Sequence, residues 1–168
     1  MEEVSLQEML AARERRSYLQ TQLLHQYKKS LISFTLNIPG SVKVLTGVPE
    51  AFASGCQRIE TLLKDRLVLI QHMETIKEKT GYEAFYSVDA NPDFIKELMV
   101  SLEDQDRLGR LFDIDVLRPD GSKVSREDMG SAPRTCLLCG QPAHVCSRSR
   151  RHSVEELTAE ISKILSGL

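Results

Sequence analysis

The chain has 168 residues, of which 27% are charged and 41% hydrophobic, a composition typical of a soluble globular protein with one domain. Its net charge of −2 and its lack of tryptophan argue against binding of a long nucleic acid, which needs a basic surface or stacking aromatic rings. No apolar run of about 18 residues is present, so we expect no membrane span. The acidic start, MEEVSLQEML, does not resemble a signal peptide, so we expect a cytoplasmic protein with reduced cysteines.

Charge is distributed unevenly along the chain. The segment from Arg118 to His152 contains seven Lys or Arg residues and three Asp or Glu residues, a net charge of +4, so the remainder carries −6. A local basic zone on an acidic body suits a phosphorylated ligand or an acidic partner protein.

The first predicted element is a helix from Ser5 to about Lys29. Ser5 and Glu8 form a capping box, and apolar residues then recur at helical spacing without Gly or Pro. Arg16 falls within this apolar stripe, and Arg13 lies one turn before it. Such arginines commonly extend to solvent or pair with a carboxylate. The alternative is that both point into a cleft and hold phosphate through paired hydrogen bonds.

A strand is predicted over 31–36, where polar and apolar residues alternate. It ends in a turn with the sequence NIPGS, residues 37–41, and Lys43 follows at once. Glycine in such a turn allows backbone N–H groups to approach a ligand, so Asn37, Gly40 and Lys43 are candidate phosphate-binding residues. An ordinary turn at the end of a strand has the same composition, and this alternative stays open.

The middle of the chain alternates between helical and strand patterns. Helices are predicted over 49–64 and 91–103, and strands over 67–76 and 82–88. With the strand at 31–36 and another around Asp113, the order becomes β-α-β-β-α-β, which is that of a ferredoxin-like split βαβ fold. We therefore predict an α+β protein whose antiparallel sheet has two helices on one face. The first and last strands would be neighbours, and the N-terminal helix would be an addition.

The last strand of this series carries two acidic residues. The sequence GRLFDIDVLRPDG, residues 109–121, combines strand formers with a turn signal. Asp113 and Asp115 project from one face of such a strand, and the apolar residues at 112, 114 and 116 project from the other face. Adjacent carboxylates repel each other unless a cation lies between them, and Mg²⁺ is the usual candidate because it also binds substrate phosphates. The alternative is a half-exposed edge strand with two solvated carboxylates.

A segment with metal-ligand character follows. Cys136 and Cys139 are separated by two residues, and Cys146 and His152 come after them. A Cys-x2-Cys turn lets two thiolates bind one ion, and a second pair completes a tetrahedral Zn²⁺ site. His144 is an alternative fourth ligand. Three reduced cysteines in a loop, or a redox pair, are the alternatives to a metal.

Arginines interleaved with serine occupy 148–151 and form either a solvated surface or a clamp for polyphosphate, because guanidinium groups match phosphate oxygens. A C-terminal helix is predicted after Ser153, with Glu156 completing a capping box. We therefore expect one domain over 1–168, with an α+β core at 30–120 and a Cys- and Arg-rich segment plus helix at 121–168.

In order and over nearly the whole chain, these motifs resemble the holo-citrate lyase synthase family, also called apo-citrate lyase phosphoribosyl-dephospho-CoA transferase. The residues that carry the resemblance are 12–16 (ARERR), 37–40 (NIPG) with Lys43, 109–116 (GRLFDIDV), 125–126 (SR), 133–139 (PRTCLLC) and 148–153 (RSRRHS).

The resemblance implies a reaction. A serine of the citrate lyase acyl carrier protein subunit attacks the α-phosphorus of 2'-(5''-triphosphoribosyl)-3'-dephospho-CoA, which forms a phosphodiester and releases pyrophosphate. Such transfer depends mainly on positioning and on charge stabilisation, with Mg²⁺ bridging phosphate oxygens. The expected catalytic residues are Asp113, Asp115, Lys43 and Arg110, and the expected substrate-binding residues are Arg13, Arg16, Asn37, Gly40, Arg126, Arg134, Arg148 and Arg151.

Two other functions compete with this one. A non-catalytic, zinc-stabilised module that binds an acidic protein through 148–151 would explain the cysteines and arginines, but not the aspartates or the turn at 37–41. A small RNA-binding domain would need exposed aromatic residues on its central strands. Its RNA phosphates would also be repelled by Asp113 and Asp115.

Overall fold

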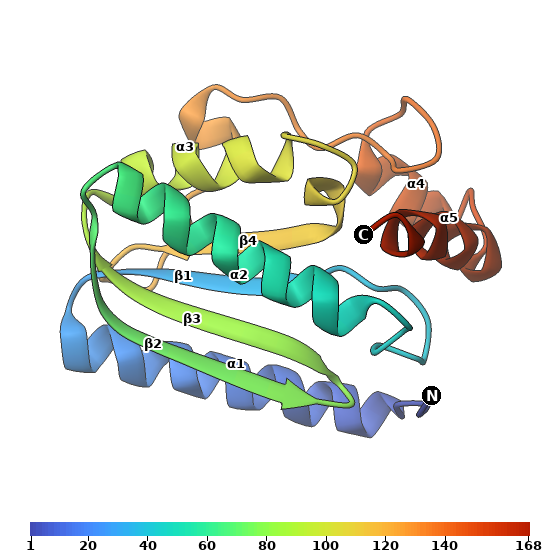
Figure 1. Cartoon of the computed structure of the whole chain (residues 1–168), viewed down its shortest axis with the longest axis horizontal. Coiled ribbons are helices and arrows are strands. Elements are labelled where there is room, and N and C mark those ends of the chain that lie inside the picture. The colour runs from blue at the N-terminus through green and yellow to red at the C-terminus, as the bar shows by residue number, and fades with distance from the viewer.

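Five α-helices, four strands and two short 3-10 turns make up the fold in the computed structural model, which describes residues 1–168 (Figure 1). The mixed α and β content predicted from the sequence is confirmed. None of the helices combines the length and the apolarity that crossing a bilayer requires. In chain order the elements are α1 (Leu6–Tyr27), β1 (Ser30–Leu36), α2 (Val48–Asp65), β2 (Leu69–Glu78), β3 (Gly81–Asp89), α3 (Pro92–Glu103), η1 (Gly109–Leu111), β4 (Phe112–Leu117), η2 (Glu127–Met129), α4 (Ala143–Ser149) and α5 (Val154–Ser166).

The strands form one antiparallel sheet in the order β2-β3-β1-β4. β1 pairs with both β3 and β4, so the prediction that the first and last strands are neighbours is confirmed. Thr35 near the end of β1 lies opposite Asp113 near the start of β4. Just beyond this pair, the backbone N–H of Asn37 donates to the carbonyl of Leu111 at 2.8 Å. This register holds the turn after β1 beside the acidic end of β4.

One face of the sheet carries the main hydrophobic core beneath α2 and α3. Side chains alternate across a strand, so every second residue reaches this face and meets the apolar stripes of the two helices. The fully buried side chains of this core include Ile32, Phe34, Tyr86, Ile95, Met99 and Phe112. Because Phe34 and Phe112 are buried, they do not provide the exposed stacking surface that RNA binding requires.

The opposite face of the sheet is covered by α1, the addition that the sequence predicts. Towards its C-terminal end α1 packs on a second, smaller cluster made of Leu23, Leu24, Leu31, Phe85 and Leu117. Towards its N-terminal end it meets polar residues instead. Arg16 pairs with Glu83 of β3 at 2.8 Å, and Gln20 donates to Ser33 of β1 at 3.0 Å. One half of this face is therefore apolar, and the other half is polar.

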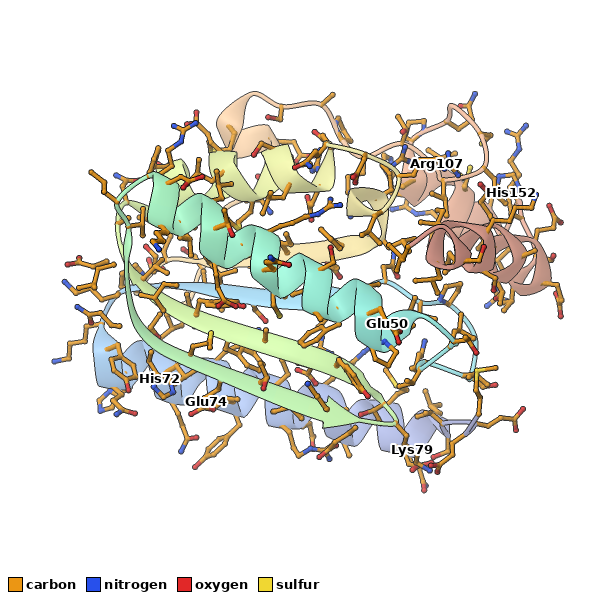
Figure 2. All side chains as sticks on the ribbon, in the orientation of Figure 1. Glu50, His72, Glu74, Lys79, Arg107 and His152 are labelled. Carbon is orange, nitrogen blue, oxygen red and sulfur yellow. The ribbon has the colours of Figure 1, made fainter.

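β2 is an edge strand, and ionisable side chains accompany it (Figure 2). His72 Nε2 lies 2.8 Å from the carboxylate of Glu74. Lys79, in the turn to β3, pairs with Glu8 of α1 at 2.7 Å. Charged side chains on an edge oppose pairing with strands of other molecules, so this edge is protected against aggregation.

The C-terminal segment lies at the end of the sheet where β1 ends (Figure 1). The capping box of Ser153 and Glu156 that begins α5 is confirmed, and Ile161 of this helix joins the main core. A Cβ added to Gly40 would lie 3.0 Å from Val154, so the turn after β1 packs directly against the start of α5. α5 therefore fixes this turn from the side opposite α1.

Several predicted boundaries differ from the structure by one or two residues, most clearly at the start of β2 and around Leu111. β2 begins two residues later than expected, because Leu67 has a φ of 58° and belongs to the turn after α2. Leu111 belongs to a 3-10 turn instead of the last strand, and a second 3-10 turn lies at Glu127–Met129. α4 is not predicted from the sequence, because its seven residues are too few to show helical periodicity.

Gly55→Ala tests the close contact between α2 and β1. Alanine is better than glycine in a helix interior by about 1 kcal/mol. Here, however, a Cβ would lie 2.3 Å from the ring of Phe34, which is held edge-on against Phe112. Overpacking a core costs about 1–3 kcal/mol, so we expect the free energy of unfolding in urea to fall by about 1–2 kcal/mol. The exposed change Gln57→Ala in the same helix is the control, and unchanged stability of Gly55→Ala would contradict the contact.

Candidate functional site

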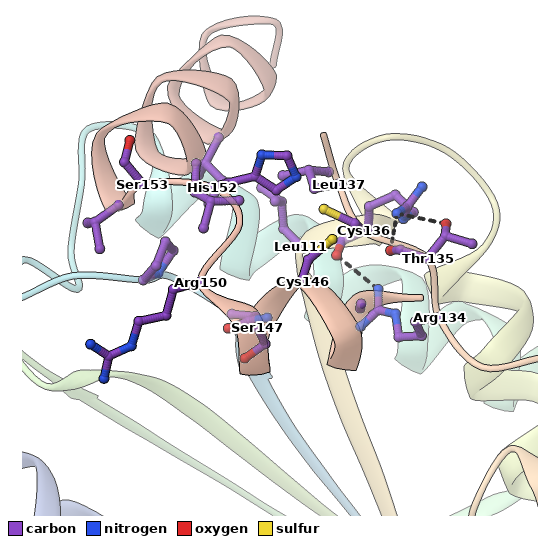
Figure 3. Close-up of a pocket in the computed structure, with 17 residues that line it drawn as sticks. Leu111, Arg134, Thr135, Cys136, Leu137, Cys146, Ser147, Arg150, His152 and Ser153 are labelled. Atoms are coloured by element: carbon purple, nitrogen blue, oxygen red, sulfur yellow. Dashed lines mark hydrogen bonds between the residues drawn. The ribbon is translucent and has the colours of Figure 1, made fainter. Parts of the chain in front are cut away.

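Two concave regions lie at the end of the sheet where β1 ends and β4 begins. The first, here named the basic crevice, has a volume of about 140 Å³ and lies between α1, the turn after β1 and the start of β4. The second, here named the α5 pocket, has about 700 Å³ and lies between η1, residues 134–137, α4 and α5 (Figure 3). Asn37 lines both. Other polar residues include Arg13, Arg16, Lys43, Glu83 and Asp113 in the crevice, and Arg110, Arg134, Cys136, Cys146, Arg150 and His152 in the pocket.

The basic crevice is lined by three cationic side chains, Arg13, Arg16 and Lys43, and by two carboxylates, those of Glu83 and Asp113. Burial, and then the nearby charge of Arg13, lower the pKa of Lys43. The Nζ of Lys43 donates to the carbonyl of Ile38 at 2.7 Å and makes no ion pair, whereas Arg16 is paired with Glu83. A phosphate group would stabilise Arg13 and Lys43 together, because it supplies the negative charge that they lack.

Asp113 and Asp115 project from the same face of β4, while the residues between and beside them are buried. Asp113 lines the basic crevice, and Asp115 lies 3.3 Å from Nζ of Lys123. Desolvation by the surrounding protein atoms, followed by the negative charges of Asp115 and Glu103, raises the pKa of Asp113. Two neighbouring carboxylates with incomplete charge compensation are suitable ligands for a hard divalent cation.

A buried carboxylate organises the structure behind the aspartates. Glu103, at the end of α3, is 3% exposed. It accepts a hydrogen bond from the backbone N–H of Ile114 at 3.0 Å, pairs with Arg126 at 2.6 Å, and lies 3.7 Å from Arg134. Arg134 also donates to the carbonyl of Phe112 at 2.7 Å. The guanidinium groups of Arg126 and Arg134 are therefore engaged in holding α3, β4 and the following segment together.

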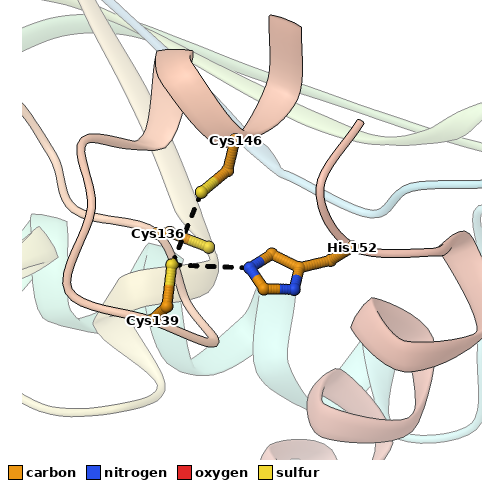
Figure 4. A group of neighbouring side chains, drawn as sticks. All are labelled: Cys136, Cys139, Cys146 and His152. Carbon is orange, nitrogen blue, oxygen red and sulfur yellow. Dashed lines mark hydrogen bonds between the residues drawn. The ribbon is translucent and has the colours of Figure 1, made fainter. Parts of the chain in front are cut away.

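Cys136, Cys139, Cys146 and His152 converge on one point (Figure 4). Their four ligand atoms lie within 4.8 Å of one another. Cys139 Sγ lies 3.4 Å from Cys146 Sγ and 3.4 Å from His152 Nε2. Zn–S bonds of about 2.3 Å in a tetrahedron place sulfur atoms about 3.8 Å apart, so this cluster fits a metal ion such as Zn²⁺ with little adjustment.

The surroundings of the cluster also match a metal site. The backbone N–H of Leu138 donates to Cys136 Sγ at 3.4 Å, a contact that favours the thiolate. The second ring nitrogen of His152, Nδ1, lies 3.8 Å from the carboxylate of Glu156. A carboxylate beside the second ring nitrogen of a histidine ligand is common at zinc sites, but a distance of 3.8 Å is too long for a hydrogen bond. His144, the alternative fourth ligand, is not part of the cluster, because it lies on α4 away from the converging thiols.

The structure brings several predicted site residues together and leaves others apart. Arg110 lines the α5 pocket, where its Nη2 donates to the carbonyl of Thr135 at 2.7 Å. Asp115, Gly40, Arg126, Arg148 and Arg151 line neither region. The last two are exposed, so their contact with a substrate stays a prediction.

Other residues at the site were not singled out from the sequence. Glu83, the partner of Arg16, could have been noticed as a lone charge in the otherwise apolar strand 82–88. Glu103 gives no such signal, because an acidic residue at the end of an amphipathic helix is usually solvated. Leu157, which lines the α5 pocket, gives no functional signal in the sequence, because a leucine at helical spacing usually belongs to the apolar stripe of a helix.

Comparison with known proteins places this chain in a family. A family model described as apo-citrate lyase phosphoribosyl-dephospho-CoA transferase matches residues 4–167. A probable apo-citrate lyase phosphoribosyl-dephospho-CoA transferase from Streptococcus pyogenes serotype M18 is 40% identical over 98% of this chain and 86% of its own length. A protein with the same description from Vibrio cholerae serotype O1 (strain M66-2) is 37% identical over 96% of this chain and 91% of its own length. Protein CitXG from Haemophilus influenzae is 35% identical over 96% of this chain and 35% of its own length.

These matches define a transferase. The chain belongs to the apo-citrate lyase phosphoribosyl-dephospho-CoA transferase family, and the resemblance found in the sequence is confirmed.

Glu103→Gln tests the buried network. Removing one partner of a buried ion pair typically destabilises a protein by about 3–5 kcal/mol, because the other charge stays buried. We expect a loss of this size in urea unfolding, since Arg126 is only 11% exposed. Glu97→Gln, an exposed change in the same helix, should change stability by less than about 0.5 kcal/mol. Equal stability of the two variants would show that Glu103 does not have this role.

Proposed function

We propose that this protein transfers phosphoribosyl-dephospho-CoA from 2'-(5''-triphosphoribosyl)-3'-dephospho-CoA to a serine of the citrate lyase acyl carrier protein subunit. The observation that carries the proposal is the basic crevice, where Arg13 and Lys43 face Asp113 although they come from three distant parts of the chain. Membership of the family supports the same reaction. The zinc-stabilised interaction module is the weaker alternative, because it does not explain why these residues form the basic crevice.

In the proposed reaction the serine oxygen forms a bond to the α-phosphorus while the bond from this phosphorus to the bridging oxygen breaks. Negative charge moves onto the departing pyrophosphate, and the hydroxyl proton is released. Arg13 and Lys43 would bind the triphosphate and stabilise this charge, which is the main contribution a protein makes to such a transfer. Arg16, already paired with Glu83, would orient α1 against the crevice.

Asp113 and Asp115 are proposed to hold Mg²⁺, which when bound supplies positive charge to the phosphate oxygens. The raised pKa of Asp113, caused in part by Asp115, supports this assignment, because a cation would relieve the repulsion between the two carboxylates. Zn²⁺ in the cluster of three cysteines and His152 would be structural, since all four positions of a tetrahedron are taken by protein ligands.

The finer description of the fold belongs to the same proposal. We treat residues 30–120 as a ferredoxin-like split βαβ core within a single domain, and 121–168 as an extension that places the cluster and α5 beside the site. The strand order β2-β3-β1-β4 supports this description, because each helix of the core connects two strands that have a third between them.

Asp113→Asn and Asp115→Asn test the catalytic assignment. Each should lower the rate of transfer at least about 100-fold while leaving the circular dichroism spectrum unchanged, because charge stabilisation of this kind is worth several kcal/mol. The measurement is mass spectrometry of the acyl carrier protein after incubation with the donor and Mg²⁺. Asp65→Asn, at the far end of α2, is the matched control. Transfer at nearly the normal rate by both variants would rule out the pair as metal ligands.

Metal analysis tests the cysteine cluster. We expect about one zinc ion per chain, and Cys139→Ser should lose most of it and lower the melting temperature, because zinc binding contributes to folding free energy. Cys56→Ser, which changes a cysteine on α2 outside the cluster, should retain the zinc. A fully active preparation without zinc would leave the cysteines with a packing role only.

A further inference from the structure

We infer that the α5 pocket binds the dephospho-CoA part of the donor while the basic crevice binds its triphosphate, so that the reacting phosphorus lies at the boundary beside Asn37. This inference rests on the proposed function and extends it, because it assigns separate subsites to the two ends of the donor. Arg150 and Leu157 are the specific residues of the dephospho-CoA subsite.

The volumes of the two regions favour this division. Pockets for ligands the size of a cofactor usually have about 300–1,000 Å³. The α5 pocket, with about 700 Å³, lies within this range, whereas the crevice, with about 140 Å³, has room for only a small group. A donor that carries a nucleotide and a pantetheine arm cannot fit in the crevice, so its larger part must lie elsewhere.

The residues that line the two regions also differ, in charge and in polarity. The crevice presents Arg13 and Lys43, whose charges have no carboxylate partners and suit a triphosphate. The α5 pocket combines apolar side chains from η1, from the segment before α4 and from α5, including Leu111, Leu137 and Leu157. Apolar walls with a few polar groups are typical of sites for an adenine ring or a pantetheine chain.

The connection between the regions matches the chemistry of the donor. One ribose separates the adenosine of the dephospho-CoA part from the triphosphate, so the two ends must occupy neighbouring sites. Asn37 is the residue that lines both regions, and its backbone is fixed by the hydrogen bond to Leu111. The short segment after β1 therefore stands where the linking ribose would pass.

Arg150 supplies the charge that the diphosphate of dephospho-CoA requires. Arg110 and Arg134 also line the pocket, but they donate to main-chain carbonyl groups. Arg150 is exposed and makes no ion pair, and Figure 3 shows it reaching out on the side of the pocket opposite Arg134. Its φ of 51° marks the left-handed residue that ends α4.

The test measures binding of two partial ligands by isothermal titration calorimetry. Dephospho-CoA is the probe for the α5 pocket, and inorganic tripolyphosphate is the probe for the crevice. Leu157→Trp should fill the pocket and weaken binding of dephospho-CoA at least 10-fold, with less than a 2-fold effect on tripolyphosphate. Lys43→Met should have the reverse pattern. Ala159→Trp, an exposed change on α5, is the control for the tryptophan.

Arg150→Ala provides a second variant that does not depend on repacking a pocket, because the side chain is exposed. We expect it to weaken binding of dephospho-CoA about 10-fold, the size of effect that the loss of one charged hydrogen bond has on an equilibrium. Arg66→Ala, an exposed arginine at the end of α2, should leave binding of both probes unchanged.

Three results would overturn the inference. They are no binding of dephospho-CoA to the wild-type protein, binding that Leu157→Trp and Arg150→Ala leave unchanged, and loss of carrier protein binding in Leu157→Trp without any change for dephospho-CoA. The proposed function is judged separately by the mass of the carrier protein. If the wild-type protein modifies the carrier while Leu157→Trp keeps a normal KM for the donor, the inference fails and the proposed function stands. If the wild-type protein modifies no carrier, the proposed function itself fails.

Discussion

The buried carboxylate of Glu103 is the constraint on which the site depends. It binds the backbone of β4 through Ile114 and attracts Arg126 and Arg134 from the segment that follows the strand. One charge thus joins a helix, a strand and a long irregular connection. The connection has little apolar content of its own. Without the Glu103 carboxylate, few interactions would therefore hold it in one conformation between β4 and the cysteines. The charge also adds to the negative potential at Asp113, so the same residue has structural and electrostatic effects.

The pairing of β1 with β4 brings the residues of the candidate site together. Their register places the end of one strand beside the start of the other, so a turn with a nearby lysine meets an acidic strand. α1 adds its arginines from one side, and α5 holds the turn from the other. Parts that lie far apart in the sequence therefore reach one edge of the sheet, and no single element would suffice for binding.

Much of this could be predicted from local patterns. The capping boxes at Ser5 and Ser153, the facing of Asp113 and Asp115, and the order of strands and helices all follow from spacing over a few residues. Convergence of the cysteines was also indicated by spacing, although the choice between His144 and His152 needed the fold. The strand register and the partners of Glu103 depend on contacts between distant residues, which periodicity does not encode.

The N-terminus is part of the same arrangement. Val4 is buried, and its backbone N–H donates to the carbonyl of Ser41 at 2.7 Å, so the residues before α1 are attached to the loop between the two concave regions. A peptide fused ahead of Met1 would emerge close to the two concave regions. The β-turn at 119–121 lies instead near the far end of α1, and Gly121 there has open space around it. Fluorescent labels or affinity handles are therefore better accommodated at that turn than at the amino end.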